Sequence, residues 1–183
     1  MHTLVLGGVR SGKSRYAESL LADASSVCYV ATAPPRPGDE EWAARIAAHR
    51  QHRPSHWRTV ECGENPESLP TVLATVADTE AILIDDLGSW VTALYDRSGW
   101  EPQSARRAFP SLITALRWTQ IPVVLVSPEV GLSVVPENRA ARMFADALGE
   151  LNQMVGEVAT GVALVVAGQP MWIKGGAPSS LSS

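Results

Sequence analysis

Residues 7–14 read GGVRSGKS and match the pattern G-x-x-x-x-G-K-[ST] of a phosphate-binding loop. The apolar run TLVL at 3–6 comes directly before the motif, and the helical pattern RYAESLLADA follows it. A strand, a glycine-rich loop and a helix in this order are the structural context that the motif requires. This stretch therefore predicts a strand–loop–helix unit that binds the phosphates of a nucleoside triphosphate.

The residue types of the motif suit phosphate chemistry. Gly7, Gly8 and Gly12 allow the backbone to curve so that successive N–H groups point at phosphate oxygens, and the start of the helix adds positive potential. Lys13 can reach the β- and γ-phosphates, and the Ser14 hydroxyl can ligate Mg²⁺. The alternative is a chance glycine turn without a ligand, which the flanking elements disfavour.

The rest of the chain alternates short apolar runs with helical patterns. Several of these runs are apolar throughout, which is typical of a parallel sheet that is covered on both faces. The alternation predicts a three-layer α/β domain over residues 1–174, and the tail 175–183, GGAPSSLSS, is expected to be disordered. The expected strands are residues 3–6, 27–31, 58–61, 81–84, 122–126 and 162–167, and the expected helices are roughly 13–24, 40–52, 66–77, 103–119 and 137–158.

The acidic pair Asp85 and Asp86 closes the apolar run AILI. A carboxylate at such a strand end can hold Mg²⁺ or bind a substrate hydroxyl, whereas the alternative is a solvated strand terminus. Asp85 is the favoured functional residue because it directly follows the run. Since the carboxyl ends of parallel strands gather around a ligand crevice, residues 31–33, Glu61 and the turn at 127–129 are expected to face the same site.

Composition narrows the classes of function. The chain has 183 residues and a formal net charge of −4, so it is a poor candidate for non-specific nucleic-acid binding. Its two cysteines, Cys28 and Cys62, do not suggest a disulfide framework or a metal site. No apolar stretch approaches the roughly 18 residues of a membrane helix, and the N-terminus does not read as a signal peptide. We therefore expect a cytoplasmic protein with neither a nucleic-acid partner nor a membrane span.

Residues 42–54 read WAARIAAHRQHRP and overlap the helix expected at 40–52, which Pro54 ends. This stretch places His49 beside Arg45, Arg50 and Arg53. A lone histidine at a helix edge is usually structural. Clustered arginines beside a neutral imidazole also suit an attack on phosphorus, because the arginines neutralise phosphate oxygens and a ring nitrogen is the nucleophile. The local sequence leaves both interpretations of His49 open.

Over nearly its whole length, to about Lys174, the chain resembles the bifunctional adenosylcobinamide kinase / adenosylcobinamide-phosphate guanylyltransferase family of cobalamin biosynthesis. The spacings HRxxRPxxW and EVGxxxVPxxxxARxFxxxxGxxNQ are more specific to that family than the phosphate loop is. The blocks that carry the resemblance are GGVRSGKSRYAE (7–18), YVATA (29–33), RIAAHRQHRPSHWRTVE (45–61), LIDDLGSWVT (83–92), EVGLSVVPENRAARMFADALGELNQ (129–153) and VVAGQP (165–170).

The resemblance implies a RecA-like P-loop fold, a homotrimer and a reaction in two steps. ATP or GTP would phosphorylate the aminopropanol hydroxyl of adenosylcobinamide. GMP would then pass from GTP to that phosphate through a covalent GMP–histidine, giving adenosylcobinamide-GDP and pyrophosphate. By its position in HRxxRP this histidine is His49, and neither His52 nor His56 occupies the matching place.

The resemblance and the motif chemistry together define a set of site residues. His49, Lys13 and Asp85 are expected to be catalytic, with Ser14 and Asp85 as the Mg²⁺ ligands. The expected nucleotide contacts are Gly7, Gly8, Val9, Arg10, Ser11, Gly12, Lys13, Ser14, Ala31, Thr32, Ala33, Arg50, Gln51, His52, Arg53, Glu61 and Asp85.

The chain departs from the family pattern at two places. Pro128 stands where the pattern has Asn, and Ser89, Trp90 and Ala93 stand where it has Thr-x-Trp-x-x-Asn. Two further hypotheses stay open, and the departures motivate the second of them. One is a small-molecule P-loop kinase that transfers only the γ-phosphate and forms no covalent nucleotide. The other is a nucleotide-binding regulatory protein that has kept the fold and lost the chemistry.

Overall fold

The structure, a computed structural model, describes residues 1–35, 38–40, 54–76, 79–132 and 134–176. The strands of these segments form one seven-stranded sheet in the order β3-β2-β4-β5-β1-β6-β7. Every neighbouring pair is parallel except β6 and β7. The strands are β1 (His2–Gly7), β2 (Val27–Ala31), β3 (Arg58–Glu61), β4 (Ala81–Asp85), β5 (Val123–Pro128), β6 (Gly161–Val166) and β7 (Gln169–Lys174).

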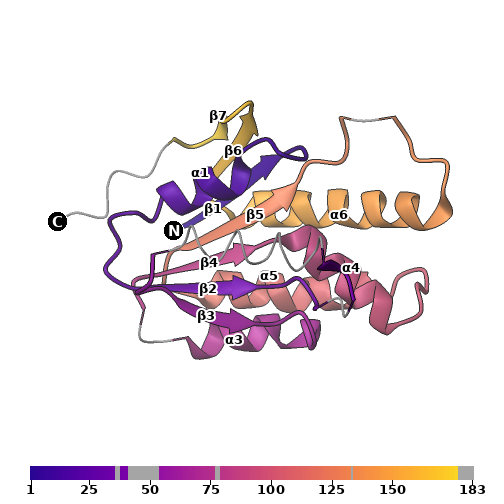
Figure 1. Ribbon diagram of the computed structural model, residues 1–183, viewed down its shortest axis with the longest axis horizontal. Coiled ribbons are helices and arrows are strands. Elements are labelled where there is room, and N and C mark those ends of the chain that lie inside the picture. The colour runs from indigo at the N-terminus through magenta and orange to yellow at the C-terminus, as the bar shows by residue number, and fades with distance from the viewer. Residues whose placement is uncertain (36–37, 41–53, 77–78, 133, 177–183) are drawn as a thin grey trace.

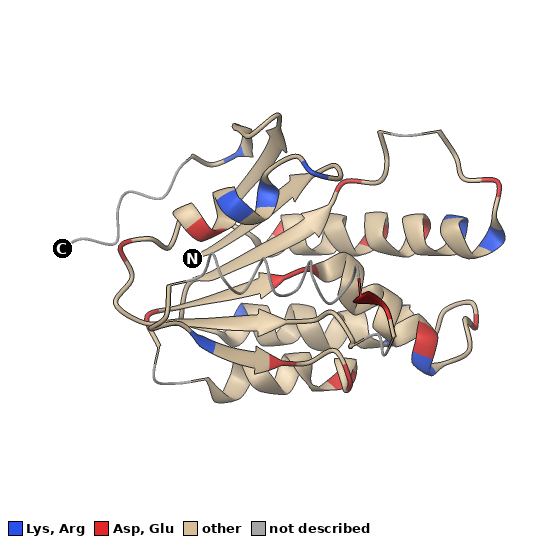
Figure 2. Cartoon of the chain, viewed as in Figure 1, with Lys and Arg blue, Asp and Glu red and all other residues tan. Residues whose placement is uncertain are grey.

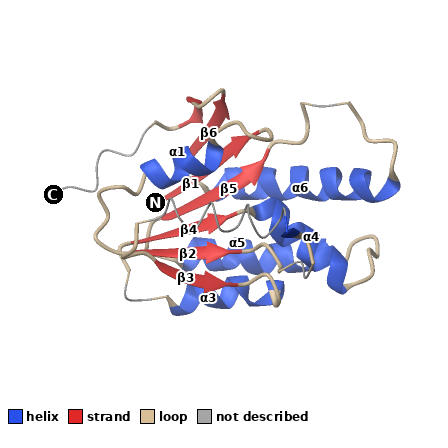
Figure 3. Ribbon diagram, viewed as in Figure 1, coloured by secondary structure: helices blue, strands red, loops and turns tan. Residues whose placement is uncertain are grey.

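Helices cover both faces of this sheet (Figures 1 and 3). One face carries α1 (Lys13–Ser19), and the other carries the four helices that follow in the described chain. The three-layer, mainly parallel architecture predicted from the sequence is therefore confirmed. The second group consists of α3 (Leu69–Thr75), α4 (Leu87–Arg97), α5 (Phe109–Trp118) and α6 (Arg139–Val158), with the 3₁₀ turns η1 (Pro66–Ser68) and η2 (Ala105–Ala108) before α3 and α5.

Two of the predictions fall largely outside the described residues. The helix expected at 40–52 cannot be compared because residues 41–53 are not described, and the same holds for residues 177–183 of the tail. None of the helices in the described part of the chain combines the length and the hydropathy needed to span a bilayer.

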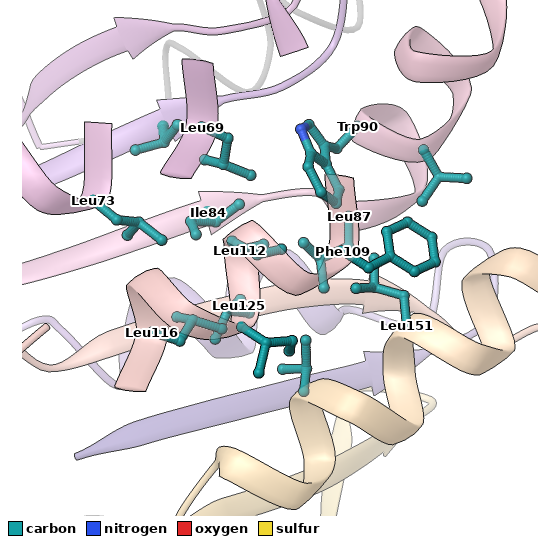
Figure 4. Close-up of a cluster of buried hydrophobic side chains, with 14 of the residues drawn as sticks. Leu69, Leu73, Ile84, Leu87, Trp90, Phe109, Leu112, Leu116, Leu125 and Leu151 are labelled. Atoms are coloured by element: carbon teal, nitrogen blue, oxygen red, sulfur yellow. The ribbon is translucent and has the colours of Figure 1, made fainter. Parts of the chain in front are cut away.

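The apolar runs are strands that bury both of their faces. Successive side chains of a strand point to opposite sides, so Leu4 joins the cluster under α3–α6 while Val5 joins the cluster under α1. Figure 4 shows Ile84, Leu87, Leu112 and other members of the first cluster packed between the sheet and its helices. Full burial of one such side chain contributes about 1.5–3 kcal/mol relative to exposure.

Both cysteines lie in the core. Cys28 and Cys62 are buried free thiols of β2 and of the turn after β3. Burial raises the pKa of both thiols. They are therefore poor nucleophiles, and their part in the fold is to fill space.

Several helix boundaries differ from the prediction. The helix expected at 13–24 ends at Ser19, because the chain then tightens into turns such as Leu21 N–H to the Glu18 carbonyl oxygen at 3.0 Å. The helix expected at 103–119 begins as η2, and its α-helical part starts at Phe109 with a proline in the first turn.

Two elements were missed. α4 follows β4 after only Asp86, and its side chains are buried almost all round, so it lacks the one-sided apolar pattern of a surface helix. β7 returns from β6 through Ala167 and Gly168, which both have positive φ, of 51° and 77°. This two-residue hairpin turn favours Asn-Gly, so an Ala-Gly pair is a weak signal for it. Pro170 is tolerated because β7 lies at the edge of the sheet.

His2 makes the stability of the fold sensitive to acid. Its ring is 8% exposed, and Nε2 donates to the Leu116 carbonyl oxygen at 2.8 Å. Nδ1 is buried and has no partner among the described residues. Burial lowers the pKa of His2. The unfolded chain then binds a proton that the folded chain excludes, so folding is penalised as the pH falls below about 6.5.

We expect the stability of the wild type to fall more steeply between pH 7.5 and 5.5 than that of His2→Gln. The excess slope is at most about 1.4 kcal/mol per pH unit, the limit for one proton. Urea unfolding at three pH values measures it, with His56→Gln as the control because His56 is exposed. Parallel curves for wild type and His2→Gln would contradict the expectation.

Candidate nucleotide-binding site

The predicted phosphate loop lies between β1 and α1. Gly12 adopts the left-handed conformation, with φ 92°, and a Cβ built there would lie 3.2 Å from Gly168 Cα. Glycine is therefore required at position 12 for two reasons, the positive φ and the close backbone approach. Ser11 N–H donates to the Gly8 carbonyl oxygen at 3.3 Å and closes the turn.

Two neighbouring segments hold the loop in place. Glu129 N–H, just after β5, donates to the Gly7 carbonyl oxygen at 3.0 Å. Gly168 N–H, in the β6–β7 turn, donates to the Ser11 carbonyl oxygen at 2.8 Å. The hairpin that the sequence did not reveal is thus a support of the phosphate loop.

Lys13 folds back across the loop. Its Nζ donates to the Gly8 carbonyl oxygen at 3.4 Å, and the side chain is half-buried. Figure 2 shows basic residues on α1 and on the loop before it. A long contact to one carbonyl is readily exchanged for stronger, charge-assisted bonds to phosphate oxygens. The lysine is therefore placed to meet a polyphosphate.

Ser14 and Asp85 meet below the loop, although they are 71 residues apart in the chain. Ser14 Oγ donates to Asp85 Oδ1 at 3.3 Å, and Tyr29 OH donates to Asp85 Oδ2 at 2.8 Å. A hydroxyl and a carboxylate are the hard oxygen ligands that Mg²⁺ prefers beside nucleotide phosphates. These two residues therefore fit a magnesium site, and Tyr29 fixes the carboxylate that would serve it.

Asp86 has a different environment from Asp85. It is the N-cap of α4, where its Oδ1 accepts from Ser89 N–H at 2.6 Å, and its backbone carbonyl oxygen accepts from Thr32 Oγ1 at 2.6 Å. Burial and then the neighbouring charge of Asp85 raise the pKa of Asp86. The sequence favoured a functional Asp85 over a solvated strand terminus, and it did not predict that Asp86 is anchored as the N-cap of α4.

The strand ends converge as expected. In the sheet Ala31 pairs with both Asp85 and Glu61, and Gly7 pairs with Pro128. Residues 31–33, Glu61, Asp85 and the turn at 127–129 therefore lie at the same edge as the phosphate loop.

The other residues expected to contact the nucleotide differ from one another in their exposure to solvent. Glu61 is exposed, whereas the side chain of Thr32 is fully buried and holds the backbone of Asp86. Val9 is 93% exposed at the tip of the loop. Five further expected site residues lie outside the described part of the chain: His49, Arg50, Gln51, His52 and Arg53.

The sequence matches the protein family described as cobinamide kinase / cobinamide phosphate guanyltransferase over residues 3–173. The chain belongs to this family. Two curated relatives, each named bifunctional adenosylcobalamin biosynthesis protein CobU, come from Salmonella typhimurium and Escherichia coli. Each is 43% identical over 185 residues, which is 95% of this chain and 100% of the relative. The protein CobP of Pseudomonas aeruginosa, with the same description, is 41% identical and covers 96% of this chain and 98% of its own.

Solved structures support the fold. An ATPase of a bacterial type III secretion system superposes with a TM-score of 0.53 at 13% identity, over 89% of this chain and 50% of its own. The assembled ATPase EscN of enteropathogenic Escherichia coli gives 0.53 at 12% identity, over 91% and 43%. This chain thus spans about half of the first structure and less of the second. Identity this low bears on the fold alone, which is that of a P-loop ATPase core.

The positions where the chain departs from the pattern of the cobinamide kinase family lie in two different environments. Ala93 is buried in α4. Trp90, which matches the Trp of the pattern, is buried in the same helix, and its Nε1 donates to the Pro66 carbonyl oxygen at 2.7 Å, so this indole belongs to the core. Ser89 and Pro128 instead line a cavity of about 210 Å³. We call it the α4–α6 cavity; its lining is Pro34, Asp86, Gly88, Ser89, Thr92, Pro128 and Phe144.

α6 fixes the end of β5 beside this cavity. Asn152 Oδ1 accepts from Ser127 Oγ at 2.6 Å, and its Nδ2 donates to the Pro128 carbonyl oxygen at 3.1 Å. The side-chain amide is therefore a bridge between helix and strand. It places Pro128 where the strand meets the phosphate loop.

A larger groove of about 790 Å³ lies between α3 and α5, and Leu73 and Trp118 are among its lining residues. Both residues belong to the last turns of their helices, which lie near the amino ends of the strands. The groove is thus at the sheet edge opposite the phosphate loop, and it is not part of the nucleotide site.

Proposed function

We propose that this chain phosphorylates the aminopropanol hydroxyl of adenosylcobinamide and then transfers GMP onto the new phosphate. Membership in the cobinamide kinase family supports both activities. The contact of Ser14 Oγ with Asp85 Oδ1 at 3.3 Å carries the proposal, because it joins the phosphate loop to the acidic strand end. A chain that had lost its chemistry would not need to retain that pairing next to Lys13.

The first step is phosphoryl transfer. The loop N–H groups and Lys13 bind the phosphates of ATP or GTP, and Ser14 and Asp85 would hold Mg²⁺. Bound there, Mg²⁺ would neutralise charge on the β- and γ-phosphates. The acceptor hydroxyl oxygen bonds to the γ-phosphorus as the bond to the β–γ bridging oxygen breaks. The nucleoside diphosphate leaves, and the hydroxyl proton is released to solvent.

The second step is guanylyl transfer through His49. A ring nitrogen of His49 bonds to the α-phosphorus of GTP, and pyrophosphate leaves. An oxygen of cobinamide phosphate then bonds to the same phosphorus, and the histidine is released. Arg50 and Arg53 would neutralise the phosphate oxygens during both exchanges. This role of His49 rests on its place in the HRxxRP block.

Other contacts of the nucleotide are proposed at the neighbouring strand ends. Residues 31–33 and Glu61 lie at the same sheet edge as Asp85, which supports their place beside the nucleotide. The homotrimer and the cytoplasmic location stay predictions. Light scattering of the purified protein would measure its molar mass and so test the homotrimer.

Product analysis tests the proposed function. The wild type is incubated with Mg²⁺, GTP and adenosylcobinamide, and the corrinoids are separated and weighed by mass spectrometry. We expect adenosylcobinamide phosphate to appear first and adenosylcobinamide-GDP with pyrophosphate to follow. Phosphorylated corrinoid that never acquires GMP would support the plain kinase instead. Bound GTP without any corrinoid product would support the regulatory protein.

A further inference from the structure

The α4–α6 cavity lies at the catalytic edge of the sheet, on the face that α1 does not cover. Asp86, Ser89 and Thr92 come from the first turns of α4, Phe144 from α6, and Pro128 from the end of β5. Figure 1 shows α4 and α6 on the same side of the sheet, with α1 on the other. The cavity and the phosphate loop therefore meet at the strand ends from opposite faces.

Asp86 connects the two sites. Its carboxylate lines the cavity, and its neighbour Asp85 accepts from Ser14 of the phosphate loop. A ligand in the cavity would thus lie next to the Ser14–Asp85 pair of the phosphate loop. A phosphoryl acceptor has to approach the γ-phosphate from the side opposite the leaving oxygen, and the cavity opens beside the loop on the face that α1 does not cover.

The size of the cavity limits what can enter it. About 210 Å³ is below the 300–1,000 Å³ of typical pockets for drug-sized ligands, so it excludes a macrocycle or a purine with its ribose. The apolar part of the wall comes from Pro34, Pro128 and Phe144. A short aliphatic arm with one polar group fits a wall of this composition.

The polar end of the cavity is a fixed carboxylate. Asp86 Oδ1 accepts from Ser89 N–H at 2.6 Å, which sets the orientation of the side chain. The hydrogen bonds from Ser89 use only part of the acceptor capacity of a carboxylate, which has about four lone-pair sites, so Asp86 can accept a further one from a ligand. Thr92 Oγ1 donates to the Gly88 carbonyl oxygen at 3.0 Å, so its proton is already used. The cavity thus offers an acceptor to a hydroxyl.

We propose that the α4–α6 cavity binds the short hydroxyl-bearing arm of the acceptor substrate, with Asp86 Oδ2 accepting a hydrogen bond from the hydroxyl that is phosphorylated. The corrinoid ring stays outside. This inference rests on the proposed kinase activity and adds to it the subsite of the acceptor.

Asp86→Asn tests the subsite. Asparagine is also a good N-cap, so α4 keeps its Ser89 contact, while the carboxylate is lost. We expect kcat/KM for adenosylcobinamide phosphorylation to fall about 10- to 100-fold, as for a lost hydrogen bond to a charged group, with the KM for the acceptor raised. The Kd of a fluorescent ATP analogue should stay within about twofold of wild type, because the nucleotide does not enter the cavity.

Ser89→Leu is the second variant, because it fills the cavity and keeps the backbone N–H that Asp86 accepts from. It should also reduce acceptor phosphorylation and leave ATP binding unchanged. In both variants, unchanged ATP binding shows that the fold is retained. Asp23→Asn, an exposed site away from the cavity, is the control for the change of charge.

The outcomes separate this inference from the proposed function. If the wild type phosphorylates adenosylcobinamide and the kcat/KM of Asp86→Asn lies within about threefold of the wild-type value, the subsite is overturned and the proposed function stands. If Asp86→Asn raises the Kd for the ATP analogue as much as it raises the KM for the acceptor, the subsite is also overturned, because the carboxylate would then contribute to ATP binding. Absence of phosphorylation by the wild type overturns the proposed function and the subsite together.

Discussion

Lys13→Ala is expected to lower kcat/KM for adenosylcobinamide phosphorylation by about 10³-fold, on the order of 4 kcal/mol of transition-state stabilisation. The ammonium now lies 3.4 Å from the Gly8 carbonyl oxygen inside the loop, so it can move to the β- and γ-phosphates without reordering the backbone. Initial rates with ATP and adenosylcobinamide measure the loss. The folded state should persist, because alanine is a good helix former at the first residue of α1.

Arg15→Ala is the matched control for Lys13→Ala. Arg15 is an exposed cation on the same helix, so its removal changes the net charge equally and leaves the loop intact. We expect its rate to stay within about threefold of wild type, because surface charges are worth little. Equal losses in both variants would show that Lys13 acts only through the general positive field, and would contradict a specific phosphate contact.

His49→Ala is expected to abolish covalent labelling of the protein by GTP that carries the label at the α-phosphate. The phosphorus–nitrogen bond of a GMP–histidine is acid-labile, so the wild-type label should survive a denaturing gel and disappear after acid treatment. Phosphorylation of adenosylcobinamide should continue in the variant, because Lys13, Ser14 and Asp85 are untouched. GMP transfer should fall by at least about 10⁴-fold, as for a lost nucleophile.

His52→Ala and His56→Ala control for the loss of any histidine near the arginines. Both should retain the label. A label that persists in His49→Ala and disappears in His52→Ala would move the nucleophile to His52. A wild type that takes up no label while it makes adenosylcobinamide-GDP would indicate direct transfer between the substrates.

Much of the fold could be predicted because its central strands are buried on both faces. β2 was expected at its observed residues, since the continuous apolar run VCYVA leaves few alternatives. β3 was also expected at its observed residues, although its side chains are mostly exposed. α4 was not predicted because a helix that is surrounded by protein shows no amphipathic period.

Some features of the candidate site could also be predicted from the sequence, and others could not. The phosphate loop was predictable because its turn chemistry is local: Gly12 needs a positive φ, and Lys13 and Ser14 follow it directly. The different environments of Asp85 and Asp86 could not be predicted. Adjacent aspartates look alike in a sequence, and their environments depend on Tyr29, Thr32 and Ser89.

By itself, the sequence determined the α/β class, the phosphate loop and the family of this protein, because periodicity, turn residues and motif spacing are properties of neighbouring positions. Only the tertiary structure decided that Ser14 meets Asp85, that Gly168 supports the loop, and that Asp86 is fixed at the wall of a small cavity. These contacts join residues far apart in the chain. The register of the parallel sheet brings them together, and no local pattern encodes that register.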